Sequence, residues 1–396
     1  MGEDRRFDRR TVLTGTLAAA GGAALAGALP GSAAAGRGPE PHPRPGRCRT
    51  SGLRGRGIAY DTGFVNGPNT THDPFDPQIV KREMQLIRHE LNCSAVRVWG
   101  GIQDRLEIAA RHAADAGLEV WYGPFTTDLT AEQMLDFLAD AADRCERLRR
   151  RGNSVVLVLG AELSLFQKGF LPGETWQERV AVLTPTNPQL PQLIAELPGK
   201  MNAFFAQAVA LVRARFRGPI SYASLAFERI DWTPFDYVGH DFYPNLVDGE
   251  YAGATAAIAS LQSHGKPVVI METGCPAYDG AAARAGHASD AIVVWDHATG
   301  RPAGIRGDPV RDEAEQSEYL IGLLELLDRE GVDSAFVYTL ASYHFRGEFD
   351  IASLGIARVL PEGSWGETYR GVPWEPKQAF RDLADHYDRV RGRRRR

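Results

Sequence analysis

The sequence is poor in cysteine and has no excess of positive charge. Its four cysteines are too few for a disulfide-stapled scaffold, and none forms the C-x-x-C pairing of a structural zinc site. The 45 lysine and arginine residues face 50 aspartate and glutamate residues, so the net charge is −5 and no overall basic field exists to bind nucleic acid. We therefore expect a fold held by packing, with no nucleic acid as a partner.

Motifs for nucleotide, metal and serine chemistry are also missing. No G-x-G-x-x-G or G-x-x-x-x-G-K-[ST] follows an apolar run, which leaves no cradle for nucleotide phosphates. The G-x-S-x-G elbow of serine hydrolases is absent. His72, Asp73 and His344 offer metal-binding atoms, but the first predicted strand lacks the H-x-H typical of metal-dependent barrel hydrolases. We expect neither a cofactor nor a metal ion.

Residues 1–35 have the layout of a secretory signal peptide. A charged start precedes a weakly apolar run over residues 12–29, and a stretch of small residues ends at Ala35. Arg9 and Arg10 lie directly before the apolar run and resemble the bacterial twin-arginine export motif. The run is too short and too weakly apolar for a stable membrane span, which needs about 20 strongly apolar residues. We predict a secreted or cell-wall-associated protein, of which a fraction could stay tethered.

The remaining sequence divides into one domain with two short flanks. Residues 36–54 are rich in glycine, proline and arginine without periodicity, which indicates a flexible leader. Residues 391–396 form a basic tail, and residues 55–390 hold the predicted domain. With 43% hydrophobic and 24% charged residues, the chain has the composition of an ordinary globular protein. Its oligomeric state is left open.

Short apolar runs alternate with longer amphipathic stretches throughout this domain. The apolar runs cover residues 57–61, 94–100, 118–123, 154–160, 220–226, 237–243, 267–273 and 334–340. Most of them are apolar without interruption, which is typical of strands buried on both faces. The helical patterns cover residues 77–91, 104–116, 130–151, 188–216, 251–264, 311–330 and 375–390, with a short, poorly marked piece after residue 228. This order predicts parallel strands joined by crossover helices.

Eight such units match an α/β fold of the (β/α)8 TIM-barrel type. An open doubly wound sheet is the alternative, which the missing nucleotide motifs disfavour. Long stretches follow the fourth, seventh and eighth strands, at residues 163–187, 274–310 and 341–374. Because the loops that follow barrel strands meet at one face, we expect these loops to build the substrate cleft.

Two glutamates lie at the ends of almost wholly apolar strands. Glu162 follows the fourth strand and Glu272 lies in the seventh. A carboxylate in such a place needs a polar cavity or partners, so both acids face the barrel mouth or tie loops together. Glycoside cleavage needs two carboxyl groups with different roles. One is protonated and gives its proton to the leaving oxygen, and the other is ionised and attacks the anomeric carbon. The pair therefore predicts a catalytic site.

At these positions the sequence resembles the retaining glycoside hydrolases of clan A, which are barrel enzymes with two catalytic glutamates. The resemblance implies that Glu162 is the acid/base and Glu272, followed by Thr-Gly, is the nucleophile. It also implies that Arg97 on the second strand lies beside the nucleophile and keeps it ionised by charge pairing. His240 and Tyr243, in the sixth run, match the place from which the clan offers a histidine and a tyrosine to the two glutamates.

Further residues near the inferred mouth are candidates for binding substrate. Trp99 and Trp121 would present ring faces to the apolar C–H faces of sugars. Asp61 and Asp241 would either bind sugar hydroxyls or accept backbone N–H bonds within loops. Glu228 is a weaker candidate because it and the arginine after it look like a solvated pair.

The leading hypothesis is an exported glycosidase that cleaves O-glycosyl bonds of a poly- or oligosaccharide with retention of configuration. In the clan, asparagine usually precedes the acid/base, whereas Ala161 stands there in this sequence, and the usual strand-eight tryptophan is also out of place. These departures leave two alternatives. One is a carbohydrate-binding barrel that has lost catalysis, and the other is a barrel hydrolase of non-sugar chemistry.

The signal-peptide interpretation predicts the mass of the exported protein. Cleavage after Ala35 removes the charged start and the apolar run, so mature protein from the culture medium should begin at Gly36. Intact-mass spectrometry and amino-terminal sequencing measure this directly. An exported protein that retains residues 1–35 would contradict the interpretation.

Overall fold

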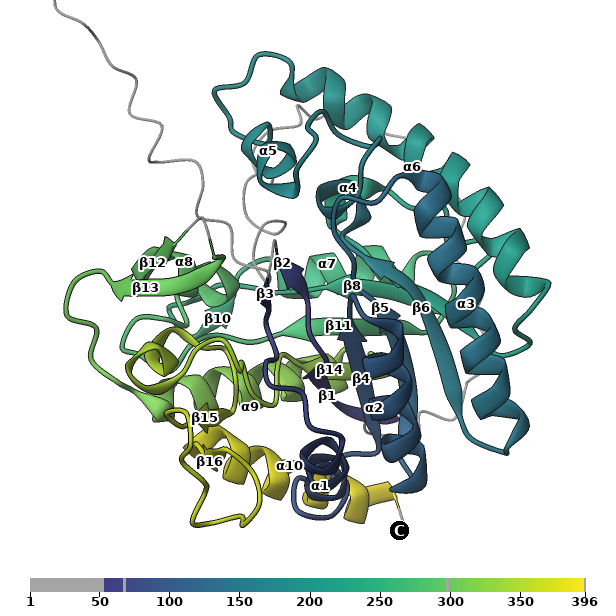
Figure 1. The fold of residues 1–396 in the computed structure, drawn as a ribbon. Coiled ribbons are helices and arrows are strands. Elements are labelled where there is room, and N and C mark those ends of the chain that lie inside the picture. The colour runs from purple at the N-terminus through teal and green to yellow at the C-terminus, as the bar shows by residue number, and fades with distance from the viewer. Residues whose placement is uncertain (1–52, 67–68, 297–298, 395–396) are drawn as a thin grey trace, which may run out of the picture.

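Eight parallel strands form a barrel at the centre of the molecule (Figure 1). The computed structural model describes residues 53–66, 69–296 and 299–394. The barrel strands are β1 (Gly55–Asp61), β4 (Ala95–Gly100), β5 (Glu119–Pro124), β6 (Val155–Ala161), β7 (Ile220–Ala223), β8 (Val238–Asp241), β11 (Val268–Thr273) and β14 (Ser334–Val337). They are neighbours in the order β7-β6-β5-β4-β1-β14-β11-β8, and a parallel bridge between Ser224 and His240 closes the circle. The predicted (β/α)8 barrel is confirmed.

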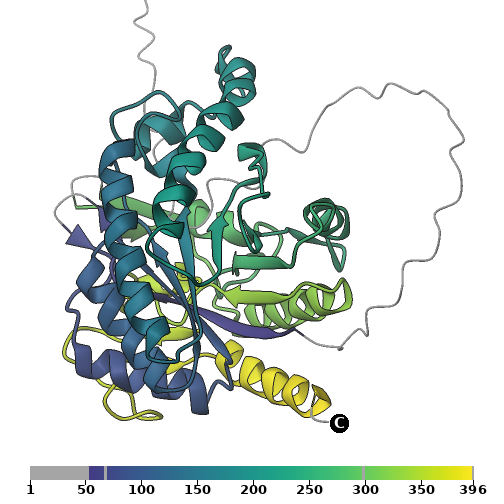
Figure 2. The ribbon, with the colours of Figure 1, turned by 90° about the vertical axis from the view of Figure 1, so that its right-hand side faces the viewer.

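Helices surround the barrel as the amphipathic patterns predict. The long helices are α1 (Pro77–His89), α2 (Gln103–Asp115), α3 (Ala131–Arg150), α6 (Leu190–Arg213), α7 (Ala254–Gln262), α9 (Glu313–Arg329) and α10 (Gln378–Arg394). Figure 2 shows the blue and teal helices α1, α2, α3 and α6 along one side of the strands, with the green α9 and yellow α10 at another. In the fifth unit, where the sequence predicts only a short piece after residue 228, the chain between β7 and β8, all of it described, forms the three-residue 3-10 helix η2 (Ala226–Glu228), which ends at that residue.

Local signals explain where several helices begin. Asp76 accepts a hydrogen bond from the Gln78 amide at the start of α1, and Pro77 occupies the first turn, where its missing N–H is harmless. At α3, the side chains of Thr130 and Gln133 each bind the other's backbone amide in a capping box. The barrel strands are buried along nearly their whole length, as their uninterrupted apolar runs predict.

The long segments after the barrel strands carry their own small elements. After β1 lies the hairpin β2 (Val65–Asn66) and β3 (Asn69–Thr70), after β6 lie α4 (Leu163–Phe166) and α5 (Trp176–Ala181), and after β8 lies the hairpin β9 (Leu246–Val247) and β10 (Glu250–Tyr251). After β11 lie η3 (Ala285–His287), α8 (Ala288–Ile292) and the hairpin β12 (Val293–Asp296) and β13 (Arg301–Ile305). After β14 lie η4 (Gly347–Ala352) and the hairpin β15 (Ala357–Val359) and β16 (Trp374–Pro376).

Arg54, which the sequence analysis assigns to the flexible leader, holds the amino-terminal end of the barrel together. Arg54 lies 2.7 Å from Glu119 and 3.0 Å from Asp333, and it donates to Ser334, so it ties β1 to β5 and β14. Leu53 is buried. These two residues are therefore fixed, in contrast to the predicted flexibility of residues 36–54, while the rest of that leader and the predicted signal peptide lie outside the described residues.

The carboxyl-terminal helix is longer than predicted. α10 continues to Arg394, so the predicted basic tail of residues 391–396 begins inside a helix. Tyr387 on this helix donates to the Gly57 carbonyl of β1 and so anchors it to the barrel. Within residues 53–66, 69–296 and 299–394, no helix has the length and apolar content needed to cross a bilayer.

A buried ion pair joins η4 to the residue directly before α10. Lys377 Nζ lies 3.1 Å from Asp350 Oδ2, neither side chain is exposed, and Arg311 lies 3.1 Å from the same oxygen. Replacing Asp350 by alanine leaves the Lys377 ammonium buried without its counter-ion. We expect Asp350→Ala to lower the free energy of unfolding by about 3–5 kcal/mol in urea titrations. A loss below about 1 kcal/mol, typical of exposed pairs, would contradict this account.

Candidate active site

Glu162 lies at a sharp turn where β6 ends. Gly160 has φ +115°, and a Cβ there would lie 2.6 Å from the Leu163 side chain, so the turn requires glycine. The backbone of Glu162 adopts the left-handed helical conformation, with φ 45° and ψ 42°, which costs a non-glycine residue about 1–2 kcal/mol. The pairing of β6 with β7 also shifts between Val158 and Ala161. The strand end is thus built to redirect the glutamate side chain, which is 2% exposed.

Glu272 lies at a second irregular strand end and has two partners. The pairing of β11 with β8 shifts between Ile270 and Glu272, and such bulges re-aim side chains beside active sites. Arg97 Nη1 donates to Glu272 Oε1 over 2.5 Å, and the Tyr243 hydroxyl donates to Oε2 over 2.9 Å. The structure therefore brings together the glutamate, the arginine and the tyrosine as the sequence analysis predicts.

The two glutamates have unlike electrostatic surroundings. Burial raises the pKa of both carboxyls. Arg97 and the Tyr243 hydroxyl lower the pKa of Glu272 again by favouring its charged form. Burial and the neighbouring acids Asp241 and Glu272 instead hold the pKa of Glu162 well above its ordinary value. The pKa of Glu272 stays above its ordinary value, but its bonds to Arg97 and Tyr243 favour the charged form, so Glu162 is the one of the two that holds its proton more strongly.

Asp241, rather than His240, is the β8 side chain that interacts with these groups. Its carboxyl raises the pKa of Glu162 and of Arg97, and the neighbouring Glu272 in turn raises the pKa of Asp241. His240 Nδ1 instead lies 3.2 Å from the Ser224 hydroxyl, and burial lowers the pKa of its ring to about 4. This bond ties one ring nitrogen of His240 to the segment after β7, and a role for His240 toward the glutamates stays a prediction.

Several buried polar atoms around the glutamates have no protein partner. They are Glu162 Oε2, both carboxyl oxygens of Asp241, Arg97 Nε and Trp99 Nε1. Buried donors and acceptors are normally paired with protein groups, water or a ligand. Their gathering at one end of the barrel is what a site for a hydroxyl-rich ligand requires.

The two predicted tryptophan platforms have different positions. Trp99 is near the carboxyl end of β4, where its ring stacks on Tyr338 with centroids 5.5 Å apart. Sequence analysis missed Tyr338, although it follows the eighth strand directly. Trp121 is the third residue of β5; its indole donates to Glu119 over 2.6 Å, and it packs on Phe336. Because Glu119 binds Arg54 at the opposite end of the barrel, the prediction that Trp121 contacts substrate is wrong.

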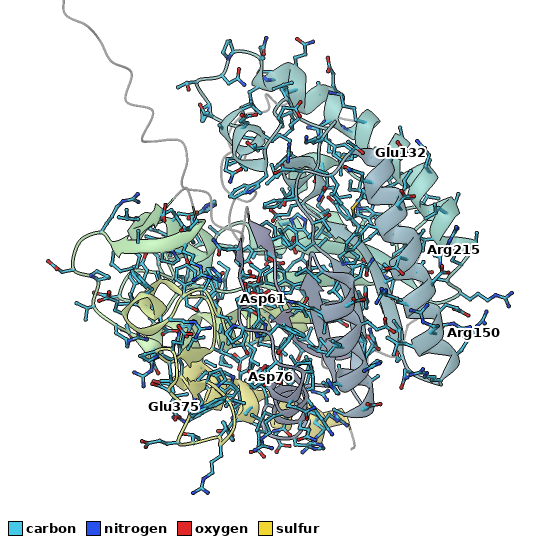
Figure 3. All side chains as sticks on the ribbon, viewed as in Figure 1. Asp61, Asp76, Glu132, Arg150, Arg215 and Glu375 are labelled. Atoms are coloured by element: carbon cyan, nitrogen blue, oxygen red, sulfur yellow. The ribbon has the colours of Figure 1, made fainter. Side chains whose placement is uncertain are left out.

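Asp61 ends β1 and organises a loop. Its Oδ1 accepts the Gly63 amide over 2.7 Å, and burial raises the pKa of its carboxyl to about 7. This is the loop-tying alternative of the sequence analysis. Figure 3 labels Asp61 near the middle of the molecule, whereas Arg150 and Arg215 extend from its outer surface.

The structure also bears on metal and thiol chemistry. Among residues 53–66, 69–296 and 299–394, no group of three or more His, Cys, Asp or Glu side chains is arranged to hold a metal ion. Cys93, Cys145 and Cys275 are buried free thiols, and burial raises the pKa of each. Raised thiol pKa values oppose a nucleophilic role.

Known proteins resemble this chain in structure. No protein-family model matches it, and no curated protein matches its sequence. A GH113 β-1,4-mannanase superimposes with a TM-score of 0.54 at 14% identity, over 85% of this chain and 99% of the other. A GH113 β-mannanase from Alicyclobacillus acidocaldarius in complex with ManMIm gives 0.53 at 13% identity, over 86% and 99%. A β-glucuronidase from Parabacteroides merdae gives 0.51 at 13% identity, over 85% of this chain and 39% of that one.

These similarities establish the fold. The chain has a (β/α)8 barrel like those of two mannanases and a glucuronidase, so the resemblance to clan A glycosidases predicted from the sequence holds at the level of the fold. At 13–14% identity the comparisons assign no residue of this chain a role. The roles therefore rest on the geometry described above.

The buried Arg97–Glu272 pair predicts a pH-dependent loss of stability when it is broken. In Arg97→Met the pKa of Glu272 rises further, because the guanidinium no longer favours the charged carboxylate. The unfolded chain then ionises this group more readily than the folded one, so the loss grows as pH rises above the ordinary glutamate range. We expect about 3–5 kcal/mol lost at pH 7.5 and clearly less at pH 4.5 in urea titrations. An equal loss at both pH values would contradict the ion pair.

Proposed function

We propose that the chain is an exported retaining glycoside hydrolase that acts on a poly- or oligosaccharide. The observation that carries the proposal is a pair of buried glutamates, at the ends of β6 and β11, of which one is paired with arginine and the other is not. This asymmetry is the division of labour that glycoside cleavage requires. The signal-like sequence of residues 1–35 supports export.

The first step would form a covalent glycosyl-enzyme. A carboxylate oxygen of Glu272 attacks the anomeric carbon, and the bond from that carbon to the leaving oxygen breaks. Glu162 gives its proton to this oxygen, so the departing group leaves as a neutral alcohol. Arg97 and Tyr243 hold the two oxygens of Glu272 and so direct the nucleophile before the sugar arrives.

The second step would return the enzyme to its starting state. Glu162, now ionised, takes a proton from water while the water oxygen attacks the anomeric carbon and releases Glu272. Two displacements at one carbon retain its configuration. Asp241 and Trp99, with unpartnered polar atoms beside the glutamates, would bind sugar hydroxyls. These contacts would replace those of the asparagine that usually precedes the acid/base in the clan, which Ala161 cannot make.

The substrate class is proposed from the structural neighbours. Two of them are β-mannanases and one is a β-glucuronidase, so we propose a β-linked glycoside and place β-mannosides first among the substrates to test. A panel of 2,4-dinitrophenyl β-glycosides with manno, gluco, galacto and glucurono configurations, together with β-1,4-mannan, covers this class. Wild-type protein that hydrolyses none of them but binds sugars would contradict the proposal and favour the non-catalytic barrel.

Azide rescue separates the roles of the two glutamates. Glu272→Ala should lose at least about 10³-fold in kcat on the best dinitrophenyl glycoside, because no covalent intermediate forms. Added azide should then give a glycosyl azide of inverted configuration. Glu162→Ala should form the intermediate from this activated substrate, and azide should give the retained β-azide. Proton NMR identifies each product.

Glu132→Ala, at an exposed position on α3, is the matched control and should keep wild-type activity. Unchanged turnover in Glu272→Ala would refute the assignment of the nucleophile. Exchange of the two azide products between the variants would show that the roles are reversed.

A further inference from the structure

Glu228 is a third buried glutamate near the candidate site, and the mechanism above does not use it. It ends η2 and its side chain is fully buried, so the sequence-based interpretation of a solvated pair with its neighbour is wrong. Arg229 has φ 48°, and this left-handed residue follows the 3-10 helix directly. A buried carboxyl is retained in a fold only where it is well paired, which makes its partners informative.

All hydrogen-bonding partners of Glu228 are donors. The Ser164 amide lies 3.2 Å from Oε1, the Leu225 amide 2.9 Å from Oε2, and the Tyr222 hydroxyl 2.9 Å from each oxygen. Tyr222 in turn accepts the Leu163 amide over 2.8 Å, which leaves its own proton free to donate to Glu228. The backbone amides can only donate, and the Tyr222 hydroxyl, which already accepts from Leu163, donates its proton to the acid, so these bonds favour the carboxylate. Burial opposes them and leaves the pKa of Glu228 above its ordinary value.

The amides that Glu228 holds belong to the two residues directly after Glu162. Ser164 is bound by Glu228 itself, and Leu163 is bound through Tyr222. The Glu162 amide donates to the Ala223 carbonyl over 2.9 Å. The segment from β7 to η2 therefore fixes three successive amides, including that of a residue in a strained left-handed conformation.

We propose that Glu228 is a positioning residue for Glu162, which it holds in the turn that directs the acid/base carboxyl toward the glycosidic oxygen. The inference rests on the proposed function of Glu162. Proton transfer requires the acid within hydrogen-bonding reach of the leaving oxygen, and small displacements of a catalytic group slow a reaction strongly. Glu228 thus acts through the backbone of α4 and does not touch substrate.

The charge of Glu228 has a second effect on the same group. The charged side chains that face Glu162 are Asp241 from β8, Glu272 from β11, Glu228 from η2 and Arg97 from β4. The three acids raise the pKa of Glu162, and Arg97 lowers it. Loss of the Glu228 charge therefore lowers that pKa, so the alkaline limb of the kcat/KM profile should move to lower pH.

The test compares two leaving groups in Glu228→Gln. Phenyl β-mannoside needs a proton at the departing oxygen, whereas 2,4-dinitrophenyl β-mannoside leaves without one; the same pair is made for another sugar if the panel above selects it. We expect kcat/KM for the phenyl substrate to fall at least about tenfold more than for the dinitrophenyl substrate. Tyr222→Phe, which removes the relay to Leu163 but leaves the Glu228 carboxyl in place, should show the same split between the two substrates.

Glu83→Gln is the matched control. Glu83 is also fully buried and also accepts hydrogen bonds from three donor groups, those of Tyr60, Tyr343 and Trp374, but it lies on α1 and holds no amide next to Glu162. This variant should lower the melting temperature without changing the ratio between the two substrates or the alkaline limb. A change in both substrates by the same factor in Glu228→Gln and Tyr222→Phe, with an unmoved pH profile, would overturn the inference.

The outcomes for the two proposals are distinguishable. If wild-type protein hydrolyses the panel and only the leaving-group split is missing, the positioning role fails and the glycosidase proposal stands. If wild-type protein hydrolyses no glycoside, the proposed function fails and this inference falls with it.

Discussion

The ion pair between Arg97 and Glu272 is the interaction on which the candidate site depends. Both side chains are 1% exposed, and their atoms approach to 2.5 Å. Buried charges are tolerated only when they are paired, so one guanidinium can satisfy one of the carboxyls gathered around it. Arg97 bonds to Glu272, which leaves Glu162 and Asp241 without a bonded cation. Burial raises the pKa of all three carboxyls, and those of Glu162 and Asp241 lie well above their ordinary values. A single arginine thereby makes three acidic neighbours chemically different.

The two glutamates lie where the regular strand pairing of the barrel is interrupted. The strands β6 and β11 both lose register at their carboxyl ends, and Glu162 adopts a left-handed turn. These irregularities are unfavourable locally and are held by the surrounding structure. Glu228 and Tyr222 supply that support for Glu162, just as Tyr243 does for Glu272. Rigid strands position the acids, and short loops set their direction.

Much of the barrel could be predicted from the sequence because its strands are buried on both faces and read as unbroken apolar runs. Arg97 and Tyr243 could be predicted from their motifs. The prediction for Trp121 is wrong because the sequence shows a buried strand but not which end of the barrel this side chain faces; its indole bonds to Glu119 at the amino-terminal end. The charged influence of Asp241 on the site could not be foreseen, because the motif that contains both Asp241 and His240 does not show which side chain lies beside the glutamates. From the sequence, Glu228 is only a weaker candidate, interpreted as part of a solvated pair, because no local pattern reveals that the Ser164 amide and the Tyr222 hydroxyl converge on it.

Infrared difference spectroscopy of carboxyl groups tests the central claim most directly. Spectra of wild-type protein at pH 7 are compared with those of Glu162→Gln and Glu272→Gln. The account predicts that Glu162→Gln removes a protonated-carboxyl band and that Glu272→Gln removes an ionised-carboxylate band. Loss of the ionised band in Glu162→Gln, or of the protonated band in Glu272→Gln, would contradict the assignment of the proton and with it the proposed division of roles.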